Sequence, residues 1–380
     1  MGQVRLLRPL GSMERYQLSK HLRRSAGPVV VAATLKGLPH RSTSAGDPTS
    51  GPDQAAYWHR CLGEGLASLC ARHPQLSLVV LDSAEPPRWA GLTQAFPVAD
   101  VVACDLATTA HWDPRDLARA LEAELQRDFD PAGAARASNS SAESADRVRL
   151  PLWRVRVLWH PDRPDECCLC WVWDHALADG LSGKQLLRSL VSRLRLPDAP
   201  TATPAVAEIR PFDFAAADDY ELPAPYDQRR PPSPAADPSD DADEFWANCV
   251  AYGRHLSANL REGAALPGLL AHVGEWPAAW ERLWRAKGDG NAATMRRTGS
   301  FELSDLGTWD EDDSGGEWRV AAVTFGQSVH VNGEALLCSV AGCVEGGLRV
   351  MVAWQDDTLA EAAVQRFLSK LGVVLTRLVS

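Results

Sequence analysis

Residues 167–195 read CCLCWVWDHALADGLSGKQLLRSLVSRLR and decide the fold of this chain. Up to Trp173, cysteines and apolar residues form a short run that is typical of a buried strand. From Ser182, which suits the N-cap position, apolar residues recur at helical spacing. These residues are Leu186, Leu187, Leu190, Val191 and Leu194. The stretch therefore predicts a strand, a sharp connection and an amphipathic helix.

The connection carries the residues that indicate chemistry. A strand-to-helix turn holds His175 at the end of a strand, and Asp179 follows four residues later. The Asp179 carboxylate could orient the imidazole or brace the loop, and Gly180 allows a backbone conformation that a Cβ would penalise. A structural histidine followed by an ordinary Asp-Gly turn explains the spacing about equally well. The flanking strand and helix, together with the following Leu-Ser-Gly, favour a functional site.

The segment DHALADGLSG resembles the HHxxxDG motif of CoA-dependent acyltransferases. That group includes plant BAHD acyltransferases, nonribosomal condensation domains and fungal alcohol O-acetyltransferases, and the chain is most similar to the last of these. The N-terminal stretch LRPLGSMERYQLSKHLRRSAGPVVVAATL and three C-terminal stretches, RTGSFELSDLG, VTFGQSVHVNGEALLCSVAG and LRVMVAWQDD, also resemble this family. The resemblance covers most of residues 4–195 and 243–378.

The resemblance implies a chloramphenicol-acetyltransferase-like fold of two halves with the active site in a tunnel between them. In that arrangement His175 takes a proton from the acceptor, Asp179 fixes the loop, and Gly180 serves the backbone geometry. Gln327, Ser328 and His330 stand where the family usually carries Phe-Ser-Gln, and Gln327 and Ser328, with Gly180, are the expected substrate-binding residues. Acetyl-CoA or another acyl-CoA is the expected co-substrate, with no tightly bound cofactor and no metal.

The chain departs from the family pattern at two places. Asp174 replaces the first histidine of the HH pair, a position that also varies in BAHD enzymes. We expect a truncated second half, because a long linker runs directly into the helix FWANCVAYGRHLSANL. The missing segment forms one wall of the tunnel in the family.

Alternating helices and strands predict an α/β class for the first half. We expect a helix from Asp53 to His73, a buried strand at 76–81, and a half-exposed strand formed by LWRVRVLW. The expected division is an N-terminal half at residues 1–196, a disordered linker at 197–243 and a shortened C-terminal half at 244–380. In the last part we expect helices at 244–260 and 277–285 and four strands between 299 and 355. A final helix is expected to open with a Thr358-Leu-Ala-Glu361 capping box and to turn Val364, Phe367, Leu371, Val374 and Leu378 inward.

Composition limits the partners of this chain. A net charge of −10 argues against nucleic acid, and no apolar run is long enough to span a membrane. The N-terminus lacks the apolar core of a signal peptide, so we expect a cytoplasmic protein, and we expect it to be a monomer. The nine cysteines are odd in number and lack metal-ligand spacing, so we interpret Cys167, Cys168 and Cys170 as reduced core residues.

Three functions remain open from the sequence. The first is an acyl-CoA-dependent O-acyltransferase that transfers an acetyl or short acyl group to a small apolar alcohol or a secondary metabolite. The second is a catalytically inactive relative that keeps the fold and binds a ligand or a partner. The third is a condensation-type domain, which is disfavoured because no carrier module is found in this chain.

Overall fold

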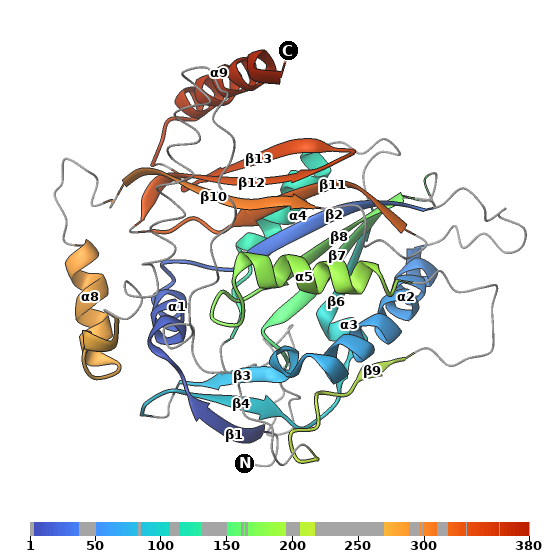
Figure 1. The fold of residues 1–380 in the computed structure, drawn as a ribbon, viewed down its shortest axis with the longest axis vertical. Helices are drawn as coiled ribbons and strands as arrows, with labels where there is room; N and C mark the ends of the chain where they lie inside the picture. The colour runs from blue at the N-terminus through green and yellow to red at the C-terminus, as the bar shows by residue number, and fades with distance from the viewer. Residues whose placement is uncertain are drawn as a thin grey trace, which may run out of the picture.

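The structure is a computed structural model of the chain (Figure 1). It describes residues 4–37, 51–82, 85–106, 114–130, 150–160, 163, 166–194, 206–216, 270–288, 297, 299–309, 318–331, 333–356 and 358–379. The helix expected at 244–260 and most of the expected linker lie outside these ranges. No helix in the described part of the chain is long and apolar enough to cross a membrane.

A five-stranded mixed sheet forms the centre of the molecule, and its strand order is β11-β2-β8-β7-β6. The strands are β2 (Val29–Gly37), β6 (Val102–Leu106), β7 (Trp153–Trp159), β8 (Glu166–Trp173) and β11 (Trp318–Gln327). β8 is the middle strand and every one of its residues is buried, as its uninterrupted apolar run predicts. The predicted α/β class is confirmed.

Helices cover both faces of this sheet (Figure 1). On one face lie α2 (Gly51–Arg72) and α5 (Gly180–Val191), and on the other lies α4 (Pro114–Leu125). Alternation along β8 sends Cys167 to the α2 and α5 side and sends Cys168 and Cys170 to the α4 side. The eight described cysteines are all free thiols, and the three on β8 are core residues as predicted.

The strand LWRVRVLW differs from its predicted half-exposed state. It forms β7, which lies between β6 and β8, and both of its faces are covered. Its charged residues are accommodated because Glu124 of α4 accepts hydrogen bonds from both Arg154 and Arg156. Burial would raise the pKa of Glu124, but the two guanidinium groups hold it below its ordinary value. Alternation alone could not reveal this buried ion cluster.

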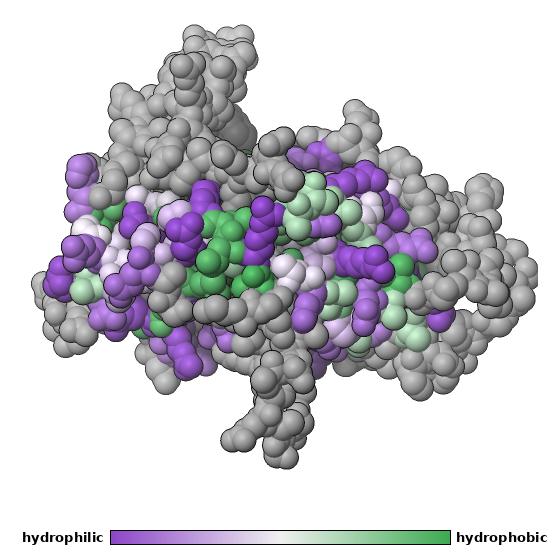
Figure 2. Space-filling model, turned by 90° about the horizontal axis from the view of Figure 1, so that it is seen from below, coloured by the Kyte–Doolittle hydropathy of each residue, from purple (hydrophilic) through white to green (hydrophobic). Residues whose placement is uncertain are grey.

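A second, three-stranded sheet of order β1-β4-β3 lies beside the first (Figure 1). Its strands are β1 (Val4–Pro9), β4 (Arg88–Leu92) and β3 (Leu78–Leu81), and the 3₁₀ turn η1 (Pro74–Ser77) leads into β3. Seen from this end of the molecule, a group of apolar residues lies near the centre of the surface, next to hydrophilic ones (Figure 2). Leu6 on β1 is one exposed apolar side chain.

Part of the expected disordered linker is ordered and packed. Within residues 206–216, β9 (Glu208–Ile209) pairs with β5 (Phe96–Pro97), which is followed by the short helix α3 (Val98–Val101). Ile209 and Phe214 are buried, and a Cβ on Gly91 would lie only 2.3 Å from the Phe214 ring. Residues 206–216 are therefore not a disordered linker, because two apolar side chains of this Pro-rich stretch are buried against the N-terminal half.

The C-terminal residues form a third sheet of order β10-β12-β13. Its strands are β10 (Gly299–Trp309), β12 (Glu334–Cys343) and β13 (Gly347–Trp354), and β10 runs parallel to β12. β11, from the same part of the chain, instead pairs with β2 in the central sheet. The cavity described below lies where these two groups of strands meet.

Three helices complete the described fold: α1 (Ser12–Leu22), α8 (Ala278–Gly288) and α9 (Glu361–Val379), with the 3₁₀ turn η3 (Leu270–His272) before α8. The indole N–H of Trp284 on α8 donates to the Ser19 hydroxyl on α1 at 2.8 Å. This contact helps to hold α8 on α1.

The final helix differs from prediction in two ways. We expected Phe367 and Val374 to face inward, but they are 38% and 51% exposed, and Val364 is its buried apolar residue. The predicted Thr358 cap does not form, because α9 begins at Glu361 and the Thr358 hydroxyl accepts a hydrogen bond from Arg297.

Candidate active site

The connection from β8 to α5 is built around the Asp174 carboxylate. One of its oxygens accepts a hydrogen bond from the backbone N–H of Ala176 at 2.8 Å. The backbone carbonyl of Asp174 accepts from the N–H of Leu177 at 2.9 Å, and its own N–H donates to Leu152. These bonds turn the chain immediately after β8 and fix the backbone on both sides of His175.

The second oxygen of Asp174 forms an ion pair with His21 of α1, and it lies 2.5 Å from Nδ1 of that imidazole. Burial would lower the pKa of His21, but the hydrogen bond and charge of Asp174 raise it overall. Burial would raise the pKa of Asp174, but the hydrogen bond and charge of His21 hold the pKa of that carboxyl below its ordinary value. Asp174 therefore has a structural partner of its own and anchors the turn to α1.

Asp179 caps helix α5. Its carboxylate accepts a hydrogen bond from the backbone N–H of Ser182 at 2.7 Å. The N-cap is thus Asp179 and not Ser182, because the helix begins three residues earlier than a cap at Ser182 predicts. Asp179 lines a separate depression of about 310 Å³ and does not line the cavity that His175 faces. Its position supports the loop-fixing role that the family resemblance implies.

Gly180 serves packing, which corrects the reason given from the sequence. Its backbone is outside the positive-φ region, so no unusual conformation requires glycine there. A Cβ would lie 3.2 Å from a methyl group of Leu306 and 3.6 Å from the Phe325 ring. Gly183 is tighter still, because a Cβ there would lie 2.2 Å from the Trp173 indole. Both glycines let α5 approach the central and C-terminal strands.

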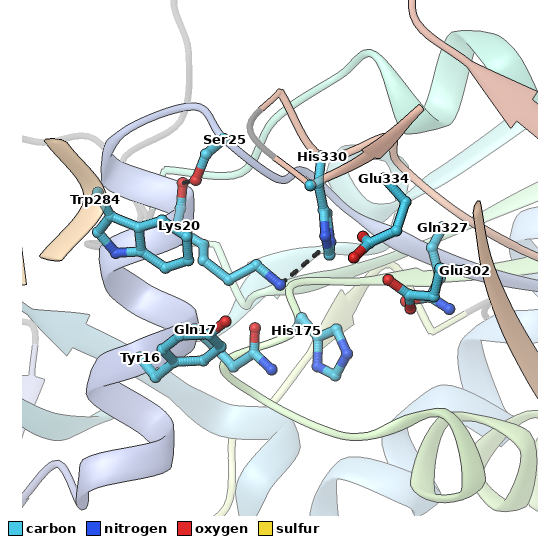
Figure 3. Close-up of a pocket in the computed structure, with 11 residues that line it drawn as sticks. Tyr16, Gln17, Lys20, Ser25, His175, Trp284, Glu302, Gln327, His330 and Glu334 are labelled. Atoms are coloured by element: carbon cyan, nitrogen blue, oxygen red, sulfur yellow. Dashed lines mark hydrogen bonds between the residues drawn. The ribbon is translucent and has the colours of Figure 1, made fainter. Parts of the chain in front are cut away.

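His175 faces a cavity of about 270 Å³ between α1, α8 and the strands β10, β11 and β12 (Figure 3). The cavity is lined by Tyr16, Gln17, Lys20, Ser25, His175, Trp284, Glu302, Gln327, His330, Gly333 and Glu334. Burial, and then the charge of Lys20, lower the pKa of His175, and these effects outweigh Asp174 and Asp179. The imidazole is therefore neutral near pH 7 and can accept a proton.

Lys20 extends across the cavity to His330 (Figure 3). Its Nζ lies 3.1 Å from His330 Nε2, and because an ammonium group only donates, that ring nitrogen accepts. Beyond His330 lie Glu302 and Glu334, whose carboxyl groups hydrogen-bond to each other. Burial, and then this bond and the charge of Glu334, raise the pKa of Glu302.

Three of these residues could in principle hold a metal ion. Glu302, His330 and Glu334 each offer a ligand atom, and the three atoms lie within 4.8 Å of one another. The Lys20 ammonium, however, engages the Nε2 of His330 and supplies positive charge beside the two carboxyl groups. An ion that used this nitrogen would have to displace the lysine.

The two residues expected to bind substrate at the end of β11 have different positions. Gln327 lines the cavity and is 8% exposed. Ser328 does not line it, because its hydroxyl accepts a hydrogen bond from the backbone N–H of Gly27. The backbone N–H of Ser328 also donates to Pro28 at 3.0 Å. Ser328 thus ties the end of β11 to the start of β2.

Sequence reasoning missed most of the cavity wall. Lys20 and His21 follow the Glu-Arg-Tyr segment on α1, and Tyr16 of that segment also lines the cavity. Glu302, His330 and Glu334 lie within the C-terminal stretches that carried the family resemblance. Those stretches could have suggested their strands, but no spacing in the sequence shows that the three side chains meet.

No family model matches the chain, and no curated protein matches it. The solved structures that this chain is similar to include the starter condensation domain of the rhizomide synthetase, as a double variant. That match has 13% identity and a TM-score of 0.41, and it covers 94% of this chain and 92% of that one.

Two further matches cover about half of this chain. A four-domain nonribosomal peptide synthetase bound to AMP and glycine matches with 18% identity and a TM-score of 0.34, over 54% of this chain and 13% of that one. The same starter condensation domain in complex with C8-CoA matches with 15% identity and a TM-score of 0.33, over 51% of this chain and 36% of that one. This chain thus spans well under two thirds of these two structures.

Proposed function

We propose that this chain is an acyltransferase in which His175 acts as general base toward an acceptor hydroxyl, with acyl-CoA as the donor. The observation that carries the proposal is the position of His175. It stands at the end of the central strand, on a connection fixed by Asp174 and Asp179, and faces a cavity as a neutral imidazole.

The proposed step needs no covalent intermediate on the protein. His175 accepts the proton of the acceptor hydroxyl while the oxygen attacks the thioester carbonyl, so that a C–O bond forms and the C–S bond breaks. The departing CoA thiolate then takes the proton from the imidazolium and leaves as free thiol. An ester and CoA are the products, and His175 returns to its neutral form.

None of the eight described cysteines lines the cavity, which supports a mechanism without a thiol nucleophile. Cys167 and Cys70 are fully buried in the core, and neither lines the cavity. Burial raises the pKa of both thiols, in the case of Cys70 to about 12. A thiol that stays protonated and lies inside the packed core is a poor acyl acceptor.

The donor class rests on the resemblance of HALADG to the acyltransferase motif. The remaining possibilities are a condensation-type reaction, in which an amine replaces the hydroxyl, and a ligand-binding protein without turnover. The geometry favours a reacting group over a purely structural histidine, because the imidazole lines an open cavity.

Release of free thiol from acetyl-CoA and from octanoyl-CoA tests the proposal, measured with and without an acceptor. Acceptors should include a simple alcohol, a polyol and an amine. Thiol release that depends on a hydroxyl acceptor and yields an ester is the expected result. An amide product would identify the condensation-type reaction, and no release above the rate without protein would favour the binding protein.

A further inference from the structure

The cavity that His175 faces is unusual in its chemistry. Ligand pockets are commonly lined by apolar and aromatic side chains with a few polar groups. Polar side chains predominate in the lining of this cavity, and Trp284 is the largest apolar side chain among the lining residues. A simple apolar alcohol would leave these polar groups without partners, which costs binding free energy.

The polar groups are mixed in sign. Lys20 supplies a buried positive charge, and Glu302 and Glu334 form a carboxyl pair opposite it (Figure 3). A cationic ligand would meet the lysine, and an anionic ligand would meet the carboxyl pair. A ligand without net charge avoids both conflicts.

The cavity also presents donors and acceptors together. The Lys20 ammonium donates only, and the Glu302 and Glu334 pair offers carboxyl oxygens that accept. Burial, and then the two glutamates, raise the pKa of Tyr16, so its phenol keeps its proton and can donate. A hydroxyl group both donates and accepts, so it suits such a surface better than a carbonyl, which only accepts, or an ammonium group, which only donates.

Gln327 is an independent sign of a ligand. Its side chain is polar and buried to more than nine tenths, and it lines this cavity. Within the described part of the chain, its amide makes no hydrogen bond with another residue. The amide is not one of the fully buried side-chain groups that lack a partner, so its polar atoms are exposed to the cavity, where a bound molecule can pair with them.

We propose that the acceptor in this cavity is an uncharged, hydroxyl-rich molecule such as a polyol or a sugar, held by Gln327 and the Glu302–Glu334 pair. The inference rests on the proposed function only in assigning this molecule the role of acceptor. Binding of the molecule does not require turnover. The rings of Tyr16 and Trp284, with centroids 5.3 Å apart, form an aromatic wall suited to the C–H face of such a molecule.

A matched pair of probes tests this inference: ribitol, with a hydroxyl on each of five carbons, and 1-pentanol, with one. Binding to the full chain is measured by calorimetry with wild type and with His175→Ala, which keeps the rest of the cavity. We expect ribitol to bind at least about 10-fold more tightly than 1-pentanol to both proteins, because a site built for hydroxyls rejects analogues that lack them.

Gln327→Leu and Glu302→Gln should each weaken ribitol binding by about 10-fold or more. Glu122→Gln, a change on the exposed face of α4, should leave it unchanged. Two cavity variants are used because one of them could fail to fold. Ribitol binding no tighter than that of 1-pentanol, including no binding of either, would overturn the inference. Ribitol binding of the same strength in the cavity variants and in wild type would also overturn the inference. The same holds for binding of Zn²⁺ at Glu302 and Glu334 without any binding of ribitol.

These outcomes are separable from the proposed function. Selective ribitol binding without thiol release would support the ligand class and reject the acyltransferase. Thiol release that is faster with 1-pentanol than with ribitol would support the acyltransferase and reject the ligand class.

Discussion

The carboxylate of Asp174 lies 2.5 Å from Nδ1 of His21, and this pair joins the turn that carries His175 to helix α1. Both side chains are largely buried. The residue that stands in place of a first histidine is therefore a structural anchor, and its partner comes from a segment more than 150 positions away in the sequence. This relationship gives the first prediction.

His21→Ala should destabilise the chain by about 3–5 kcal/mol, because it leaves the Asp174 charge buried without its partner. The double variant His21→Gln, Asp174→Asn removes both charges and should lose less. Urea unfolding monitored by tryptophan fluorescence measures both. A loss for the double variant equal to or greater than that for His21→Ala would contradict the role of the ion pair.

The pair also predicts how this loss depends on pH. Pairing raises the pKa of His21 above 6.5, so its contribution is present below that pH and is lost as pH rises through the raised pKa. Pairing lowers the pKa of Asp174 below 3.8, so its contribution is present above that pH and is lost as pH falls through the lowered pKa. The stability difference between wild type and His21→Ala should therefore be largest between these two values.

Asp179→Ala should lower the stability by about 0.5–2 kcal/mol, because α5 loses the oxygen that accepts from Ser182 N–H. Asp179→Asn should retain most of the stability, since asparagine is an equally good N-cap. Thermal unfolding of both variants provides the comparison. An equal loss for Asn and Ala would show that the charge of Asp179, and not its cap, stabilises the loop.

Lys20→Met should move the pH profile of the reaction. The general base works in its neutral form, so kcat/KM should rise with pH and level off above a pKa lower than 6.5. The positive charge of Lys20 disfavours a protonated His175, so removing it should shift this midpoint to higher pH. Lys370→Met, on an exposed position of α9, is the matched control and should not move it. A midpoint unchanged by Lys20→Met would remove Lys20 from the control of His175.

The sequence predicts those parts of the molecule that local patterns determine. β2, β8, α2 and α5 follow from apolar runs and helical spacing, and each is buried where the pattern indicates. His175 could be selected because a strand, a turn and a helix follow one another within one short segment. Its position at a cavity agrees with that selection.

The rest of the site depends on tertiary contacts that no local pattern encodes. The motif position of Ser328 predicts a substrate ligand, but its hydroxyl accepts a hydrogen bond from the backbone N–H of Gly27. Glu302, His330 and Glu334 come from two strands and a loop, and only the folding of β10 beside β12 brings them together. Phe214 shows the same limit for the linker, because its partner is a glycine on β4.

His175 is the general base on which the proposed reaction depends. Its most direct test is the initial rate of ester formation from acyl-CoA and a hydroxyl acceptor, for wild type beside His175→Ala, with folding checked by circular dichroism. We predict that the variant folds normally and that its rate falls by about 10²- to 10⁴-fold, the usual cost of removing a general base. Equal rates for the two folded proteins would contradict the account.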